Sequence, residues 1–199
     1  MRIRRSYLLF LFSLAVVTSG CMHQGPVQNQ NFREVQYLTE LEGVYVNKGD
    51  PKGFLSQEIW PKVGNFSHEA IQYIEVNSAN DTLIVKAIKS DCVVYERSYV
   101  LGRDFSLVDG AISIRSKSHA FSRGPGDLVL GPSFQSTTLG VDPSGNGKSR
   151  DSFAMAGLVL MILPIALSDT REVKYLKSTQ AIHTFKKCSG FGGGVDASE

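Results

Sequence analysis

The sequence predicts a mainly β protein, an antiparallel β-barrel or sandwich-like meander with one or two short N-terminal helices. After residue 68, short segments rich in branched and aromatic residues are separated by turn residues, a pattern typical of strands. Asp109-Gly110 lies between two such segments and is a strong signal for a two-residue hairpin. Residues 111–115 alternate apolar and polar side chains, so we expect one face of the sheet to meet water.

The elements before residue 68 are expected to be short. Val35, Leu38 and Leu41 are spaced three apart, which predicts a short amphipathic helix. A strand at 44–47 and a turn follow, and residues 54–60 suit a second short helix that ends before Pro61.

The remaining chain is expected to alternate strands and loops. The predicted strands are 71–76, 82–88, 92–101, 105–108 and 111–115, then one or two within 128–141 and a last one within 172–187. The predicted loops are 116–127 and 142–152. Together they give a single β-rich domain over 32–189, followed by a glycine-rich, disordered tail at 190–199.

The run 153–167 is the most apolar segment after the first twenty residues. As a helix, its 15 residues would reach only about 22 Å, short of a bilayer core of about 30 Å. We interpret it as a buried strand ending at Pro164, with a core helix or an exposed binding patch as alternatives. The patch would present Leu158, Leu160 and Ile162.

The first twenty residues read as an export signal. Three arginines within residues 2–5 form a basic region, an apolar stretch follows at 7–17, and small residues precede Cys21. The apolar stretch, about 11 residues, is too short for a lasting transmembrane helix. The alternative is an ordinary secretory signal cut near Ser19 or Gly20, which would leave Cys21 as a free or disulfide-bonded thiol.

Thr18-Ser19-Gly20-Cys21 resembles the processing signal of bacterial lipoproteins, apart from Thr18, where that family most often has Leu or Val. The resemblance implies cleavage before Cys21, acylation of this residue with palmitate-like chains and a membrane anchor. Residues 21–31 would then be a flexible tether. Met22 stands where Asp commonly marks retention at the inner membrane, so in a two-membrane cell the resemblance implies an outer-membrane location facing the periplasm. Residues 41–47 also resemble the Leu-x-Gly-x-Tyr-x-Asn opening of small exported lipoproteins of unknown function, and the entrance strand of lipocalin-type and avidin-type barrels.

The charge of the chain argues against one class of binding partner, and its cysteines suggest a disulfide. Removing the three leader arginines from 21 basic residues leaves 18, against 19 acidic residues, so nothing indicates a nucleic-acid partner. In an oxidising compartment we expect Cys92 and Cys188 to form a disulfide, the alternative being two separately buried thiols.

Catalytic and cofactor motifs are not apparent. Residues 145–149 look like part of a phosphate-binding loop, but that motif requires a glycine five positions before Gly147, and Asp142 occupies this position. No nucleotide is therefore expected. No zinc-protease, hydrolase-elbow or dithiol motif occurs, and neither a cofactor nor a metal is expected. His119, with Asp109 and Asp127 near it in sequence, is the one candidate base or ligand.

We therefore expect a non-catalytic, membrane-anchored envelope lipoprotein that binds or scaffolds envelope components, other envelope proteins among them. The alternatives are a carrier of an apolar ligand in a lipocalin-like barrel and, less favoured, an enzyme with a loop-borne site. An apolar cavity of about 300 Å³ or more would favour the carrier. A filled interior with an exposed apolar patch would favour the scaffold.

Overall fold

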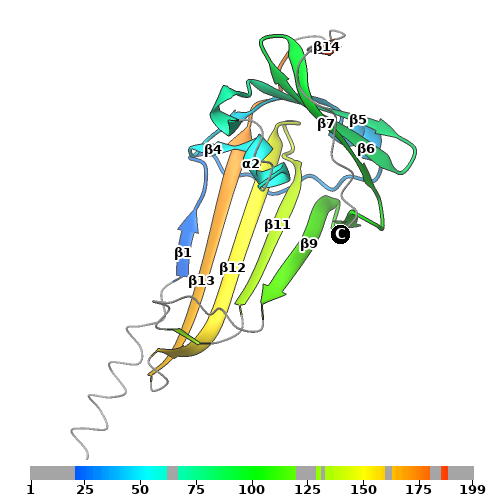
Figure 1. Ribbon diagram of the computed structural model, residues 1–199. Helices are drawn as coiled ribbons and strands as arrows, with labels where there is room; N and C mark the ends of the chain where they lie inside the picture. The colour runs from blue at the N-terminus through cyan, green and yellow to red at the C-terminus, as the bar shows by residue number, and fades with distance from the viewer. Residues whose placement is uncertain are drawn as a thin grey trace, which may run out of the picture. The chain divides into compact units, whose positions relative to one another are not determined.

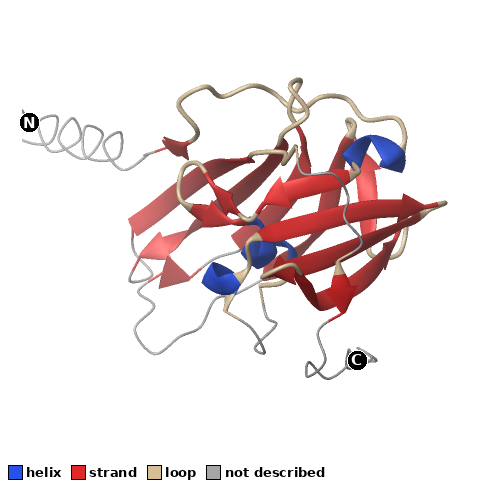
Figure 2. Ribbon diagram, turned by 90° about the horizontal axis from the view of Figure 1, so that it is seen from above, coloured by secondary structure: helices blue, strands red, loops and turns tan. Residues whose placement is uncertain are grey.

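The computed structural model describes residues 21–61, 67–119, 129–130, 133–159, 163–179 and 185–187. Strand makes up 58% of the structure. Figure 2 shows that the helices among the described residues are short. The prediction of a mainly β, mostly antiparallel fold is confirmed. Within the described residues the strands form three sheets, and no closed barrel is found.

The largest sheet has seven strands. Figure 1 shows β9, β11, β12 and β13 side by side in it. Its order is β1 (Cys21–Gln24), β13 (Leu163–Tyr175), β12 (Gly147–Val159), β11 (Ser133–Val141), β9 (Ala111–His119) and β8 (Phe105–Val108), with β10 (Val129–Leu130) beside β12. β1 pairs with β13 in parallel, whereas the β8–β9 and β10–β12 pairs are antiparallel.

The second sheet has five strands. Its order is β14 (Lys186–Lys187), β7 (Cys92–Val100), β6 (Thr82–Lys89), β5 (Tyr73–Ala79) and β2 (Gly43–Val46). β2, β5, β6 and β7 form an antiparallel meander, and β14 joins β7 in parallel. A two-stranded sheet consists of β3 (Lys48–Gly49) and β4 (Gly53–Phe54).

The chain divides into two compact units. The first comprises residues 1–24, 116–136 and 151–171, and the second comprises 25–115, 137–150 and 172–199. The hydrophobic core found among the described residues lies in the second unit. Its buried side chains come from both sheets: Tyr45, Ile74, Leu83, Val85, Ala87 and Val94 from the five-stranded sheet, and Phe105, Val141, Val173 and Tyr175 from the seven-stranded one.

Inside the second unit the two sheets adjoin at both sides. On one side the segment after β13 runs along the outer edge of β2, where Val46 N–H donates to Leu176 O (2.9 Å) and Ser178 N–H donates to Val44 O (2.7 Å). On the other side Leu101 and Phe105 form an isolated bridge between the end of β7 and the start of β8. The five-stranded sheet and this part of the seven-stranded sheet therefore enclose a common interior.

Two-residue turns connect several strands. Asp109 and Gly110 have φ values of 49° and 72°, the left-handed pair that a tight hairpin needs, so the predicted hairpin is confirmed. Ser90 and Asp91 turn β6 into β7 in the same way. Gly110 has a second reason to lack a side chain, because a Cβ there would lie 2.3 Å from the backbone nitrogen of Val35.

The helical predictions are confirmed in part. The first is a single 3-10 turn, η1 (Leu38–Leu41), and the second is α2 (Leu55–Ile59). A further 3-10 turn, η2 (His68–Ala70), precedes β5. Among the described helices none combines the length and the apolar character needed to cross a bilayer.

Two predicted boundaries were wrong. The loop expected at 142–152 is a tight turn, because Asp142 Oδ1 accepts the N–H groups of Ser144 and Asn146, both at 2.9 Å, and β12 begins at Gly147. The strand expected to end at Pro164 stops at Val159, and Pro164 lies inside β13 instead. The core-helix alternative for this run is wrong for residues 153–159 and 163–167, which are strand; residues 160–162 lie outside the described part of the chain.

Two further predictions differ in extent from the structure. β9 continues to His119, so the start of the loop expected at 116–127 is strand. The segment expected to be a tether contains β1, and Asn29 and Gln30 make side-chain or backbone contacts with Lys148.

Candidate functional site

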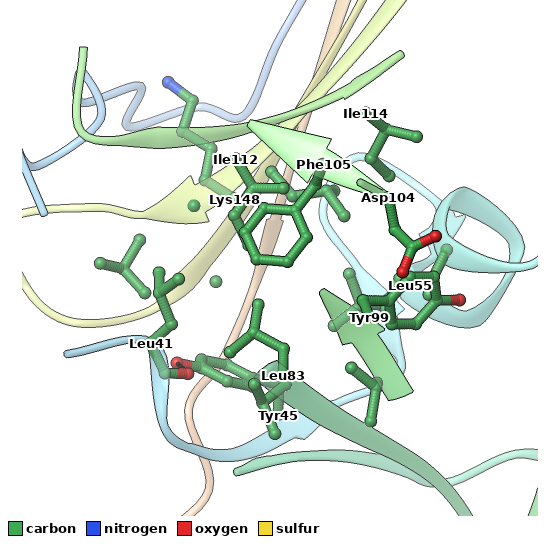
Figure 3. A pocket seen from close by; sticks show the side chains of 17 residues that line it. Leu41, Tyr45, Leu55, Leu83, Tyr99, Asp104, Phe105, Ile112, Ile114 and Lys148 are labelled. Carbon is green, nitrogen blue, oxygen red and sulfur yellow. Dashed lines mark hydrogen bonds between the residues drawn. The ribbon is translucent and has the colours of Figure 1, made fainter. Parts of the chain in front are cut away.

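The interior of the second unit contains an apolar cavity of about 110 Å³. Figure 3 shows the side chains that surround it. Both sheets contribute, and α2 adds Leu55 and Ile59. The other lining residues are Leu41, Tyr45, Val76, Leu83, Val85, Tyr99, Asp104, Phe105, Ile112, Ile114, Leu139, Gly140, Val141, Gly147 and Lys148.

Strand alternation explains how the chain builds these walls. Leu83 and Val85 on β6, and Ile112 and Ile114 on β9, are each two residues apart, so each pair projects from one face of its strand. Ser113, between the two isoleucines, is not among the cavity residues. The expected division of β9 into an apolar and a polar face is therefore confirmed for residues 112–114.

The two charged residues at the cavity direct their charges elsewhere. Lys148 contributes its stem, and Figure 3 shows its nitrogen turned away from the other lining side chains. Its ammonium group donates to Asn29 Oδ1 (2.8 Å) and to the carbonyl of Gln30, and pairs with Glu172 Oε2 (3.2 Å). The carboxylate of Asp104 accepts the N–H of Val100 (2.8 Å) and pairs with Arg103 (2.9 Å).

A buried ionic network lies next to the cavity. Lys148 and Glu172 are only 3% and 2% exposed, and Glu172 Oε1 also pairs with Arg150 Nε at 2.5 Å. Burial alone would raise the pKa of Glu172, but Arg150, Asn29 and Lys148 together outweigh it and hold this pKa below its usual value. The carboxylate therefore stays charged at neutral pH, with both oxygens paired.

A second, partly buried ion pair links the Asp142 turn to β13. Lys174 Nζ lies 3.0 Å from Asp142 Oδ2. Burial acts to raise the pKa of Asp142, while Lys174 and Asn146 lower it further than burial raises it. Both pairs tie β13 to neighbouring segments and provide no free acid or base.

The tyrosines at the cavity are equally unsuited to proton transfer. Burial raises the pKa of Tyr45 to about 12, and its hydroxyl donates to Leu41 O at 2.8 Å. Burial also raises the pKa of Tyr99, against the opposing effects of Arg97 and Trp60. These walls offer apolar contact to a ligand and no pair of groups that could exchange protons near neutral pH.

The structure locates the predicted lipidation and disulfide residues only in part. The backbone of Cys21 begins β1. Cys92 is disulfide-bonded. Cys188 lies outside the described residues, so its pairing with Cys92 stays a prediction, and the alignment of Lys186 with Cys92 is compatible with it.

The other predicted site residues are not brought to the cavity. Leu158 lies in β12 opposite Leu130, and Leu160 and Ile162 lie outside the described residues. His119 ends β9, and Asp127 is outside the described part of the chain. The loop-borne enzyme site therefore gains no geometry from the structure.

Sequence reasoning missed the ionic network and most of the cavity. Lys148 was assigned to a loop and Glu172 to a strand without a role. No local signal marked Glu172, because strand alternation places it on the face opposite the core residues Val173 and Tyr175, where a charged side chain is normally exposed.

Within the described ranges no three His, Cys, Asp or Glu side chains gather in a way that could hold a metal ion. No protein-family model, curated protein or solved structure matches this chain.

Proposed function

We propose that the protein is a lipid-anchored, non-catalytic binding protein of the bacterial cell envelope, held at the outer membrane through Cys21. The observation that carries the binding role is the apolar cavity, whose charged neighbours are already paired. The Thr18–Cys21 sequence supports the anchor. Acylation with more than one chain would give stable attachment.

The size of the cavity limits what it can bind. Its volume of about 110 Å³ is below the ~300 Å³ at which drug-sized ligands are usually accommodated. A dry cavity of on the order of 150 Å³ is known to take benzene. We therefore propose a small apolar group, such as the end of an alkyl chain, and not a whole lipid.

Ligand-dependent thermal stability tests the cavity. With benzene as the probe, the purified full-length protein in detergent should melt at a higher temperature, because a ligand that binds only the folded state stabilises it. Leu83→Ala should enlarge the cavity and increase the shift, and Leu83→Trp should fill it and abolish the shift. Leu176→Trp is the matched control, since Leu176 is 59% exposed and away from the cavity. Equal shifts in all four proteins would refute a cavity role.

Cell fractionation tests the anchor separately. Cys21→Ser should move the protein from the membrane fraction to the soluble fraction, and intact-mass analysis should find acyl chains only on the native form. A native protein without added acyl mass would refute the lipoprotein proposal.

A scaffolding role has support of its own in the first unit. Phe134 on β11 and Phe153 on β12 are 58% and 37% exposed, and these strands are neighbours in the sheet. Exposed aromatic residues on adjacent strands suit contact with another envelope protein. Replacing both with Ser should reduce in-cell crosslinking to such a partner, and unchanged crosslinking would count against this role.

A further inference from the structure

We infer that the second unit carries a separate site for a small, neutral saccharide on the outer face of its β8–β9–β11 region. A hollow of about 330 Å³ lies there, at the lower end of the size range of ligand sites. We call it the outer hollow. It is lined by Asn31, Phe32, Val108, Asp109, Ala111, Ser113, Thr138 and Arg150.

The outer hollow and the apolar cavity use opposite faces of the same strands. On β9, Ala111 and Ser113 line the hollow whereas Ile112 and Ile114 line the cavity. On β11, Thr138 lines the hollow and its neighbour Leu139 lines the cavity. Because successive side chains of a strand point to opposite faces, the two sites are separated by the sheet itself.

One wall of the hollow is the segment that precedes η1. Its backbone is fixed where Arg33 N–H donates to Val141 O (2.8 Å) and Val35 N–H donates to Gly110 O (3.1 Å). Phe32 packs over Gly140, where a Cβ would lie 2.9 Å from the ring. The hollow is therefore bounded by hydrogen-bonded backbone on the segment side and by strands on the other.

The Phe32 ring is also held by charge. The guanidinium of Arg150 lies 5.0 Å from its centroid, within the range of a cation–π contact. Arg150 in turn pairs with the buried carboxylate of Glu172, which compensates its charge. An aromatic wall thus stands in the hollow next to an arginine whose charge is already balanced.

The polar lining supplies both donors and acceptors. Asn31 offers an amide, Asp109 a carboxylate, and Ser113 and Thr138 hydroxyls. The side-chain hydrogen bonds found within the described ranges involve none of these four groups. They are thus available to a ligand in the structure as described.

This combination fits a saccharide better than an anion or a hydrocarbon. Hydroxyl groups of a sugar can both donate to Asp109 and Asn31 and exchange hydrogen bonds with Ser113 and Thr138, while its C–H face packs on Phe32. An anion would meet the carboxylate of Asp109, and a hydrocarbon would cover four polar groups without replacing their hydrogen bonds to water.

Ligand-observed NMR and calorimetry with the full-length protein in detergent test the inference. The probes are cellobiose and the β-1,4-linked disaccharide of N-acetylglucosamine. We expect at least one to bind. Ser113→Ala removes a hydroxyl, and Asp109→Asn replaces a charged acceptor by a weaker neutral one, so each should weaken its binding about five- to tenfold. Asn suits the left-handed conformation of residue 109, so this variant keeps the turn.

Matched variants separate this site from the cavity. Ser98→Ala replaces an exposed strand serine of the other sheet and should leave saccharide binding unchanged. Leu83→Trp should also leave it unchanged, so failure of the cavity proposal would not affect this result. The inference is overturned if neither disaccharide binds at millimolar concentration, if Ser113→Ala and Asp109→Asn bind as the native protein does, or if inorganic phosphate displaces the sugar.

Discussion

Glu172→Gln should destabilise the protein more than the loss of an ordinary surface charge. The substitution keeps the shape of the side chain but removes the charge that balances Lys148, which is 3% exposed. Lys148 would then have only neutral partners: the oxygens of Asn29 and Gln30, the new amide oxygen, and the ring of Phe32, whose centroid lies 5.1 Å from its nitrogen. Arg150 is 38% exposed and can turn toward water, so most of the cost comes from Lys148.

The expected magnitude follows from the burial of the pair. Removing one partner of a buried ion pair costs about 3–5 kcal/mol. Because Gln keeps some hydrogen bonding, we expect about 3 kcal/mol, the lower end of that range. For a chain of this size the melting temperature should then fall by about 6–12 °C.

Urea unfolding at neutral pH, followed by circular dichroism, measures this effect. Lys148→Met combined with Glu172→Gln should recover part of the loss, because the double variant no longer buries an unbalanced charge. Glu96→Gln, at an exposed position on β7, is the matched control and should stay within about 0.5 kcal/mol of the native protein. If Glu172→Gln behaves like Glu96→Gln, the network does not stabilise the fold and the reasoning fails.

Three other predictions concern stability and burial. Gly110→Ala should lower the free energy of unfolding by about 2 kcal/mol or more, because the new Cβ would meet backbone atoms 2.3–2.4 Å away. Gly102 also has a positive φ, but the space around it is open, so Gly102→Ala should lower it by only about 1–2 kcal/mol in the same urea assay. The pKa values of Glu172 and Asp142 are lower in the folded protein than in the unfolded chain. Their contribution to the free energy of unfolding is therefore complete above the usual carboxyl pKa values, and it is lost as the pH falls through the folded values. A free energy of unfolding that stays constant as the solution is acidified below pH ~4 would contradict this. Trp60, the one tryptophan, is 2% exposed and should resist quenching by acrylamide until the protein unfolds.

The strands that could be predicted from the sequence are those with local signals. β6 and β7 begin at the predicted residues, Thr82 and Cys92, because branched residues and flanking turns mark them. The hairpin at Asp109-Gly110 was predicted for the same reason, since its turn geometry depends on two adjacent residues.

The features that the sequence did not reveal depend on contacts between distant segments. Residues 147–150 were assigned to a loop because they are polar, yet they begin β12 and Lys148 has a buried partner 24 positions later in the chain, Glu172. The cavity likewise arises from the arrangement of two sheets, which no single segment encodes. The sequence predicts a polar outer face on β9. It does not predict that the segment around Phe32 packs beside this face and forms a hollow with it.

The segment that follows β13 also has a consequence for the order of assembly. β2 is among the first strands to be made, but its free edge finds a partner only when residues near 177 arrive; Lys177 Nζ donates to Glu42 O across 135 positions of sequence. A chain emerging from its N-terminus must therefore leave this edge unpaired until residues 176–178 have been delivered. An unpaired edge of this kind invites intermolecular pairing, so nascent or truncated forms should need a chaperone that shields β2.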